Sequence, residues 1–395
     1  MIERPSRILP VIVLSQLAGG SLWFAGNAVL PDLQSRLGLP DSALGHMTSA
    51  VQLGFIAGTL VFASLAVSDR YSPRATFLAC SLLGAACNAS SYFVGGEISL
   101  LLLARFATGF FLAGIYPVGM KIASGWYRHD LGKALGFLVG ALVVGTALPH
   151  LIRGLGQSLP WETVILSVSA IAALGGVMMY ALVPDGPFLG ASAKFSPGSL
   201  RAIFRLARFR ASSFGYFGHM WELYTFWAFV PPMLVAYKSR PTELDLNVSL
   251  LTFAVIAAGA IGCVVGGYLS LRFGSARVAR VQLSASGLCC LLSPLMFYAS
   301  PILFIAFLLV WGIVVAGDSP QFSALNARYA PADQVGSALT IANCIGFSIT
   351  IVSIQLLNYA ASVVPISYLF LLLVPGPVLG LLALRPLLSG NAARL

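Results

Sequence analysis

Long apolar segments separated by short polar turns occupy nearly the whole chain. One transmembrane helix requires about 20 mostly apolar residues, and a helix pairs its own backbone polar groups inside hydrocarbon. The pattern therefore predicts twelve transmembrane helices in an all-α membrane protein. Their approximate ranges are 8–31, 43–67, 75–95, 99–125, 133–157, 163–183, 211–236, 248–271, 277–298, 300–325, 336–360 and 365–385.

The longest polar stretch, residues 184–210, separates these segments into two groups of six. It is rich in basic residues, and we expect it to include a short amphipathic helix on the membrane surface. The predicted domains are a six-helix bundle at residues 1–190, a cytoplasmic central loop at 191–210 and a second six-helix bundle at 211–395.

The two groups of segments also resemble each other in sequence. Gly114–Pro117 precedes Gly132–Leu135 in the first group, and Gly317–Pro320 precedes Gly336–Leu339 in the second, at offsets of 203 and 204 residues. Chance similarity between glycine-rich helices is the alternative. A duplicated six-helix unit is typical of transporters, in which the substrate binds between the halves near the middle of the membrane.

Composition and charge agree with a membrane protein. Of 395 residues, 58% are hydrophobic and 9% are charged, whereas soluble domains carry about a quarter charged residues. The net charge of +10 does not indicate a nucleic-acid partner, because no basic patch is interleaved with aromatic residues. The expected partners are a lipid bilayer, a small-molecule substrate and protons or another coupling ion.

The distribution of basic residues between loops predicts the topology. If both termini are cytoplasmic, the outer loops contain only Arg36, Arg153, Lys238 and Arg240, and most other basic residues lie inside. This bias follows the positive-inside rule. We therefore expect a multi-pass protein of the cell membrane, in bacteria the inner membrane, with both termini in the cytoplasm.

Two loops carry a repeated basic pattern. Asp69, Arg70 and Arg74 lie between the second and third segments, and Arg272 and Arg277 lie between the eighth and ninth. These loops resemble the signature G-x-x-x-D-R-x-G-R-R of the major facilitator superfamily. The first copy lacks the glycines, and the second has a leucine in place of the acid. An ordinary positive-inside turn is the alternative.

The fourth segment strengthens the resemblance, because Arg105, Gly109 and Gly114 match the family's R-x-x-x-G pattern and its further glycines. The resemblance covers nearly the whole chain. It implies the major facilitator fold, secondary transport by alternating access and a monomer. It also implies that the two basic loops latch the cytoplasmic side.

Ionisable residues inside the predicted helices are the main candidates for chemistry. A charge at the bilayer centre costs at least about 2.5 kcal/mol on insertion scales, so Arg105, Glu222 and Asp318 each need a partner or a function. Arg105 is a candidate substrate or gating cation, and Glu222 or Asp318 a candidate proton-coupling acid. The alternative is that Arg105 forms a fixed ion pair with an acid of the seventh or tenth helix. Lys121 lies close enough to the inner membrane boundary for its ammonium group to reach the water there.

Further polar and aromatic residues accompany these charges. Four of them surround Glu222, one follows Asp318 in a stretch that a proline interrupts, and three are isolated polar positions on other helices. Hydrogen bonding between helices is the alternative role for the isolated positions. The set comprises His219, Trp221, Tyr224 and Trp227, then Gln321, and then Asn27, Gln52 and Asn343.

Three functions fit these features. We favour a proton-coupled carrier of a small organic or inorganic anion, and the alternative is a proton-driven exporter of amphipathic or cationic compounds. A membrane enzyme is disfavoured because the H-E-x-x-H and G-x-S-x-G motifs are absent, and a receptor is expected to carry a further soluble domain. The six cysteines lack metal-ligand spacing, and we expect no cofactor or metal.

Overall fold

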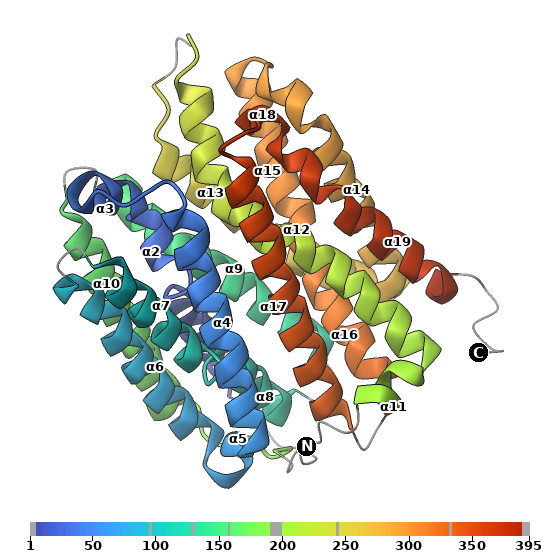
Figure 1. Ribbon diagram of the computed structural model, residues 1–395. Coiled ribbons are helices and arrows are strands. Elements are labelled where there is room, and N and C mark those ends of the chain that lie inside the picture. Colours follow the sequence, from blue (N-terminus) through green and yellow to red (C-terminus); the bar gives the residue numbers. More distant parts are fainter. Residues whose placement is uncertain are drawn as a thin grey trace. The chain divides into compact units, whose positions relative to one another are not determined.

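The computed structural model describes residues 5–94, 97–127, 131–156, 159–189, 200–241, 245–331 and 334–388. Every secondary-structure element in these ranges is a helix (Figure 1). The chain divides into two compact units, Met1–Lys194 and Phe195–Leu395. Residues 191–199 of the expected central loop lie outside the described ranges, and residues 200–210 are helical except for Leu206.

The N-terminal unit provides the first six expected spans. Three short helices form the first span, and two helices form the fourth. The elements are α1 (Ile8–Gly20), α2 (Ala25–Ala28), α3 (Leu30–Leu37), α4 (Ala43–Ser64), α5 (Val67–Arg70), α6 (Pro73–Ser90), η1 (Ser91–Phe93), α7 (Ile98–Leu112), α8 (Tyr116–Trp126), α9 (Leu131–Leu155) and α10 (Trp161–Leu182).

The C-terminal unit provides the other six spans. A short helix precedes the seventh span, and the tenth and twelfth spans are interrupted. The elements are α11 (Leu200–Arg205), α12 (Ala207–Lys238), α13 (Val248–Phe273), α14 (Ser275–Phe297), α15 (Pro301–Gly317), α16 (Ser319–Tyr329), α17 (Val335–Ala360), α18 (Ile366–Leu369), η3 (Phe370–Leu373) and α19 (Pro375–Leu388).

The expected spans agree closely with these helices. Within the described ranges, nine stretches are long and apolar enough to cross a membrane, and Ile8–Gly20 is a shorter apolar helix. The other two expected spans correspond to α6 and to α12, which carries His219 and Glu222 within its membrane segment. The predicted all-helical fold of twelve spans is confirmed.

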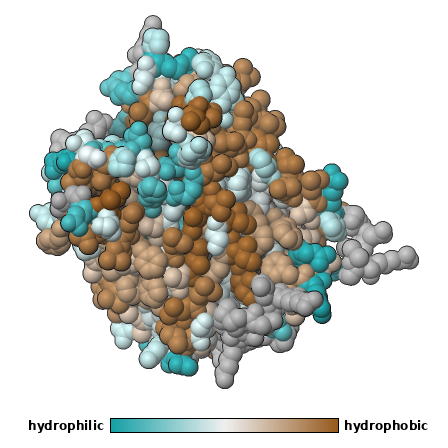
Figure 2. Space-filling view, viewed as in Figure 1, coloured by the Kyte–Doolittle hydropathy of each residue, from teal (hydrophilic) through white to brown (hydrophobic). Residues whose placement is uncertain are grey.

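Large apolar side chains face outward along the helices. Leu103 on α7, Leu271 on α13 and Ile302 on α15 are 62%, 75% and 78% exposed. Brown apolar side chains cover broad areas of the helix flanks in Figure 2, whereas the teal polar side chains gather near helix ends. Such surfaces are suited to contact with lipid tails, which are as apolar as leucine.

The same helix pairs pack together in each unit. In the N-terminal unit α1 packs against α9 and α10, α4 against α7, and α6 against α10. In the C-terminal unit α12 packs against α17 and α19, α13 against α15, and α14 against α19. Numbered as spans, these are equivalent pairs, so the repeat that the sequence suggested is also a repeat of packing.

One glycine contact is repeated in both units. A Cβ atom on Gly109 of α7 would lie 2.1 Å from the Val51 carbonyl oxygen of α4, and one on Gly312 of α15 would lie 2.0 Å from that of Val255 on α13. The two glycines are 203 residues apart, and the two valines 204. Small residues allow helix backbones in membranes to approach this closely.

We expect Gly109→Ala to destabilise the protein, because α4 and α7 must move apart to admit the methyl group. Overpacking of this kind costs about 1–3 kcal/mol. A lower melting temperature in detergent would show it. Gly267→Ala on α13 is the matched control, since a Cβ there has no atom within 4 Å. Equal melting temperatures for the two variants would contradict the packing argument.

Candidate functional site

The first span is interrupted between two short helices, and a side chain from another helix donates hydrogen bonds to the carbonyl groups at the interruption. α1 ends at Gly20 and α2 begins at Ala25, so the carbonyl oxygens of Leu22 and Trp23 lie in a non-helical turn. Arg105 Nη2 on α7 donates to both oxygens, at 3.0 Å and 2.7 Å. The arginine thereby replaces the helical hydrogen bonds that membrane-embedded backbone requires.

The same guanidinium extends this network to two further helices. Arg105 Nη1 donates to Asn88 Oδ1 on α6 at 2.8 Å, and Asn88 Nδ2 donates to the Ile165 carbonyl and to Ser169 Oγ on α10 at 3.3 Å and 3.0 Å. Arg105 is 1% exposed. Within its own unit, the described hydrogen-bond partners of the guanidinium are therefore all neutral acceptors.

Several buried polar atoms near this break have no protein partner among the described residues. They are Arg105 Nε, Asn27 Oδ1 and both amide atoms of Gln52. Asn27 Nδ2 donates to Thr48 Oγ1 at 2.8 Å, which joins α2 to α4. A Cβ on Gly26 would lie 2.6 Å from Met47 Cε and 3.1 Å from Arg105 Nε, so a larger residue there would press on both side chains. Buried polar atoms rarely lack partners, which makes these atoms candidates for substrate contact.

Glu222 on α12 lies at the centre of a hydrogen-bond network in the C-terminal unit. Ser286 Oγ on α14 donates to its Oε2 at 2.9 Å, while Trp311 Nε1 on α15 and Cys290 Sγ on α14 lie 2.8 Å and 3.3 Å from Oε1. The side chain is 1% exposed. The sequence indicated Glu222 but not these three donors, because they lie on other helices.

Asp318 and His219 form a second buried pair close to Glu222. Asp318 stands between α15 and α16, and its Oδ1 lies 2.8 Å from His219 Nδ1 on α12. Asp318 Oδ2 and His219 Nε2 have no described hydrogen-bond partner, and His219 precedes Glu222 by three residues on α12, which places both on the same face of that helix. We call Glu222, Asp318 and His219 the acidic cluster.

The aromatic and polar candidates differ in their surroundings. The Tyr224 ring lies 5.1 Å from Trp227 and 5.2 Å from Phe347. Trp221 Nε1 donates to the Leu372 carbonyl at 3.1 Å, a packing contact with η3. Among the remaining candidates, Gln321 on α16 is buried and Asn343 on α17 is half-buried.

The basic loop of the N-terminal unit is bound to its own helix ends. Lys121 Nζ on α8 donates to the Ser68 carbonyl of α5 at 2.8 Å, and Arg74 forms an ion pair of 3.6 Å with Asp185. Arg70 is exposed. The side chain of Asp69 lies outside the described part of the structure.

The basic loop of the C-terminal unit turns at Gly274, whose φ of 82° lies in a region that favours glycine. Arg272 and Arg277 are exposed on either side of it, and the Arg272 guanidinium lies over the Phe273 ring at 5.3 Å. The glycine that this loop shares with the family signature therefore has a conformational reason.

The family model described as the Major Facilitator Superfamily matches residues 12–354 and 212–391. The chain belongs to this superfamily. The resemblance that the loop and fourth-helix motifs indicated is therefore confirmed, and the chain is a multi-pass membrane protein of this superfamily.

Relatives of this superfamily member include transporters of Escherichia coli. The putative uncharacterized transporter YgaY of strain K12 is 27% identical over 188 residues, which cover 46% of this chain and 45% of YgaY. The putative transporter AraJ of the same strain is 24% identical over 290 residues, or 70% of this chain and 68% of AraJ. The chain thus spans less than half the length of YgaY.

Solved structures show the same fold. The human organic anion transporter MFSD10 is 16% identical with a TM-score of 0.70, covering 96% of this chain and all of its own. The proton:xylose symporter XylE is 15% identical with a TM-score of 0.76, covering 98% of this chain and 96% of its own. At these identities the likeness supports the major facilitator fold.

Proposed function

We propose that this chain is a proton-coupled secondary transporter and that its acidic cluster carries the coupling proton. The observation that supports this is the burial of Glu222, Asp318 and His219 in one unit. Arg105 is the only Lys or Arg side chain buried among the described residues, and it lies in the other unit. The cluster therefore has no fixed cation of its own.

Electrostatics makes proton exchange the natural function of such a cluster. Burying a charge away from water is costly unless it is paired and hydrogen-bonded. Two carboxylates beside a single imidazole are best accommodated when at least one proton is bound. A conformational change that admitted water to the cluster would favour release of that proton, and this is the step that couples a gradient to movement.

We further propose a small organic or inorganic anion as the substrate. Arg105 Nη2 holds the break in the first span and Nη1 binds Asn88, while Nε remains a buried donor without a described partner. The unpartnered amide of Gln52 adds a further donor in the same unit. A cation with a spare donor favours an anionic ligand.

An exporter of amphipathic cations is the second candidate. Its support is the aromatic group Tyr224, Trp227 and Phe347, carried by the helices α12 and α17 of the acidic unit. Aromatic faces attract cations, and the carboxylates of the acidic cluster would do the same.

Ligand binding separates the two candidates. The purified protein is heated with organic anions, inorganic anions, quaternary ammonium compounds and neutral sugars, since a ligand that binds only the folded state raises the melting temperature. We expect an anion to give the largest shift and to drive proton movement in liposomes. A shift confined to cations would favour export, and substrate movement without protons would exclude the coupling proposal.

We also propose that both termini face the cytoplasm of a bacterial cell, that the protein functions as a monomer and that the two basic loops latch its cytoplasmic side. The distribution of arginines and lysines supports the orientation. The contacts of Lys121 and Arg74 support the latch, because they fix the loop that would carry it.

A further inference from the structure

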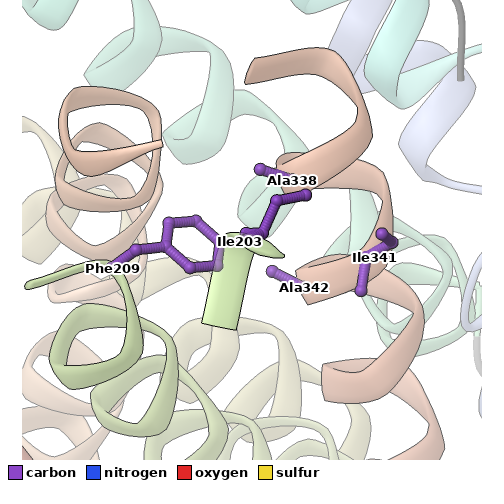
Figure 3. Close-up of a cluster of buried hydrophobic side chains, with 5 residues drawn as sticks. All are labelled: Ile203, Phe209, Ala338, Ile341 and Ala342. Atoms are coloured by element: carbon purple, nitrogen blue, oxygen red, sulfur yellow. The ribbon is translucent and has the colours of Figure 1, made fainter. Parts of the chain in front are cut away.

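The short helix α11 is fixed against two membrane helices by an apolar cluster. Ile203 of α11 is fully buried and meets Phe209 of α12 together with Ala338, Ile341 and Ala342 of α17. Figure 3 shows the Ile203 side chain directed between the Phe209 ring and the residues of α17. α11 is therefore held beside the ends of α12 and α17.

An open groove lies beside this cluster, bounded by α11, α12 and α17. It has a volume of about 700 Å³, which falls in the range of about 300–1,000 Å³ for small-molecule sites. Most of its wall is apolar, and two arginines complete it. The lining residues are Phe204, Arg205, Arg210, Phe214, Phe217, Ile345 and Ile349.

The charge of this groove is uncompensated. Arg210 Nη1 donates to the Phe204 carbonyl at 3.1 Å, which fixes its guanidinium and leaves its other N–H groups available. Neither Arg205 nor Arg210 forms an ion pair with a carboxylate in the described ranges. The sequence also contains no acidic residue between Asp185 and Glu222. The groove is therefore positively charged.

The charged and apolar parts of the groove are separated along the helices. Phe214 and Phe217 follow Arg210 by four and seven residues on α12, or about 6 Å and 10 Å along its axis. Their rings pack edge to face at 5.6 Å, and Ile345 and Ile349 lie one turn apart on α17. The groove thus combines a cationic end with an apolar floor that follows two membrane helices.

We propose that this groove binds an anionic glycerophospholipid, with its phosphate at Arg205 and Arg210 and an acyl chain along the phenylalanines and isoleucines. Arginine binds phosphate through paired hydrogen bonds. The predicted topology places this groove in the cytoplasmic leaflet, where anionic lipids attract basic segments. The bound lipid would join α11 to α12 and α17 and stabilise the C-terminal unit.

Lipid binding can be measured on the full chain in detergent. Phosphatidylglycerol and phosphatidylcholine are added separately, and lipid adducts are counted by native mass spectrometry alongside the melting temperature. We expect phosphatidylglycerol to bind and to raise the melting temperature more than phosphatidylcholine. The double variant Arg205→Gln/Arg210→Gln should bind it roughly 30-fold more weakly, since each basic residue contributes about fivefold.

Two further variants test whether the lipid binds in this groove. Ile349→Trp should weaken phosphatidylglycerol binding by filling the apolar floor without changing charge, whereas Arg280→Gln, an exposed arginine on α14 outside the groove, should leave it unchanged. Equal binding by the double variant, or equal binding of both lipids, would overturn the proposal. Stabilisation by inorganic phosphate as large as that by phosphatidylglycerol would also overturn it, because the acyl chain would then contribute nothing.

Discussion

Replacement of Glu222 by glutamine is expected to reduce substrate-driven proton movement to background while substrate exchange continues. Trp311 Nε1 and Ser286 Oγ now donate to different carboxylate oxygens, at 2.8 Å and 2.9 Å. The single amide oxygen of glutamine can still accept from Trp311, and its NH2 group can donate to Ser286 Oγ, because a hydroxyl also accepts. The replacement removes only the group that can bind and release a proton. The measurement is internal pH in liposomes that contain the purified variant, with counterflow of the substrate as the exchange assay.

The control for this variant is Asp245→Asn, which also replaces a carboxylate by an amide. Asp245 is exposed, and the hydrogen bond from Lys238 Nζ at 2.6 Å lowers its pKa below the usual value. It therefore stays ionised at physiological pH and cannot serve as the coupling acid. Wild-type proton movement in Glu222→Gln would exclude Glu222 from that role.

Replacement of Arg105 by alanine is expected to destabilise the protein by about 3 kcal/mol or more. Three buried acceptors, the carbonyls of Leu22 and Trp23 and Asn88 Oδ1, lose their donor. An unsatisfied buried group costs about 1–3 kcal/mol, although hydrogen bonds in membranes average less. The melting temperature in detergent measures the effect. Arg105→Lys should restore little of the stability that Arg105→Ala loses, because the lysine ammonium is a point charge and lacks the planar fork of donors of a guanidinium.

Arg36→Ala provides the comparison for Arg105→Ala. Arg36 pairs with Glu162 at 3.0 Å but its side chain is 57% exposed, and exposed ion pairs contribute about 0–1 kcal/mol. If Arg105→Ala melted like the wild type and lost only anion binding, Arg105 would act in substrate recognition and not in packing. If Arg105→Ala lost binding of anions, cations and neutral compounds equally, the proposal of an anionic substrate would lose its support.

Hydrophobic patterning was sufficient to predict the helices. A span must exceed a fixed length in hydrocarbon, so its ends are marked by polar residues, and the expected range 336–360 differs by one residue from Val335–Ala360. The offset of about 203 residues between the halves also predicted a repeat, which the contacts of Gly109 and Gly312 reproduce. The break between α1 and α2 was not expected, because apolar residues run through it.

The side-chain partners could not be derived from the sequence in the same way. Ser286, Cys290 and Trp311 approach Glu222 from helices that are 64 to 89 residues away in the chain. Asn88 on α6 likewise gives no indication in the sequence that its partner is Arg105. A polar residue embedded among apolar ones was the available indication, and it marks that a partner is required without identifying it.

The contact between Arg105 and the turn after α1 has a consequence for biosynthesis. The arginine follows Leu22 by 83 residues and Trp23 by 82, so the first span leaves the ribosome long before its donor exists. Until the fourth span has entered the bilayer, the turn must draw on water or on the insertion machinery to solvate its carbonyls. The first four spans are therefore expected to leave the translocon together, and a nascent chain truncated before residue 105 should remain associated with it.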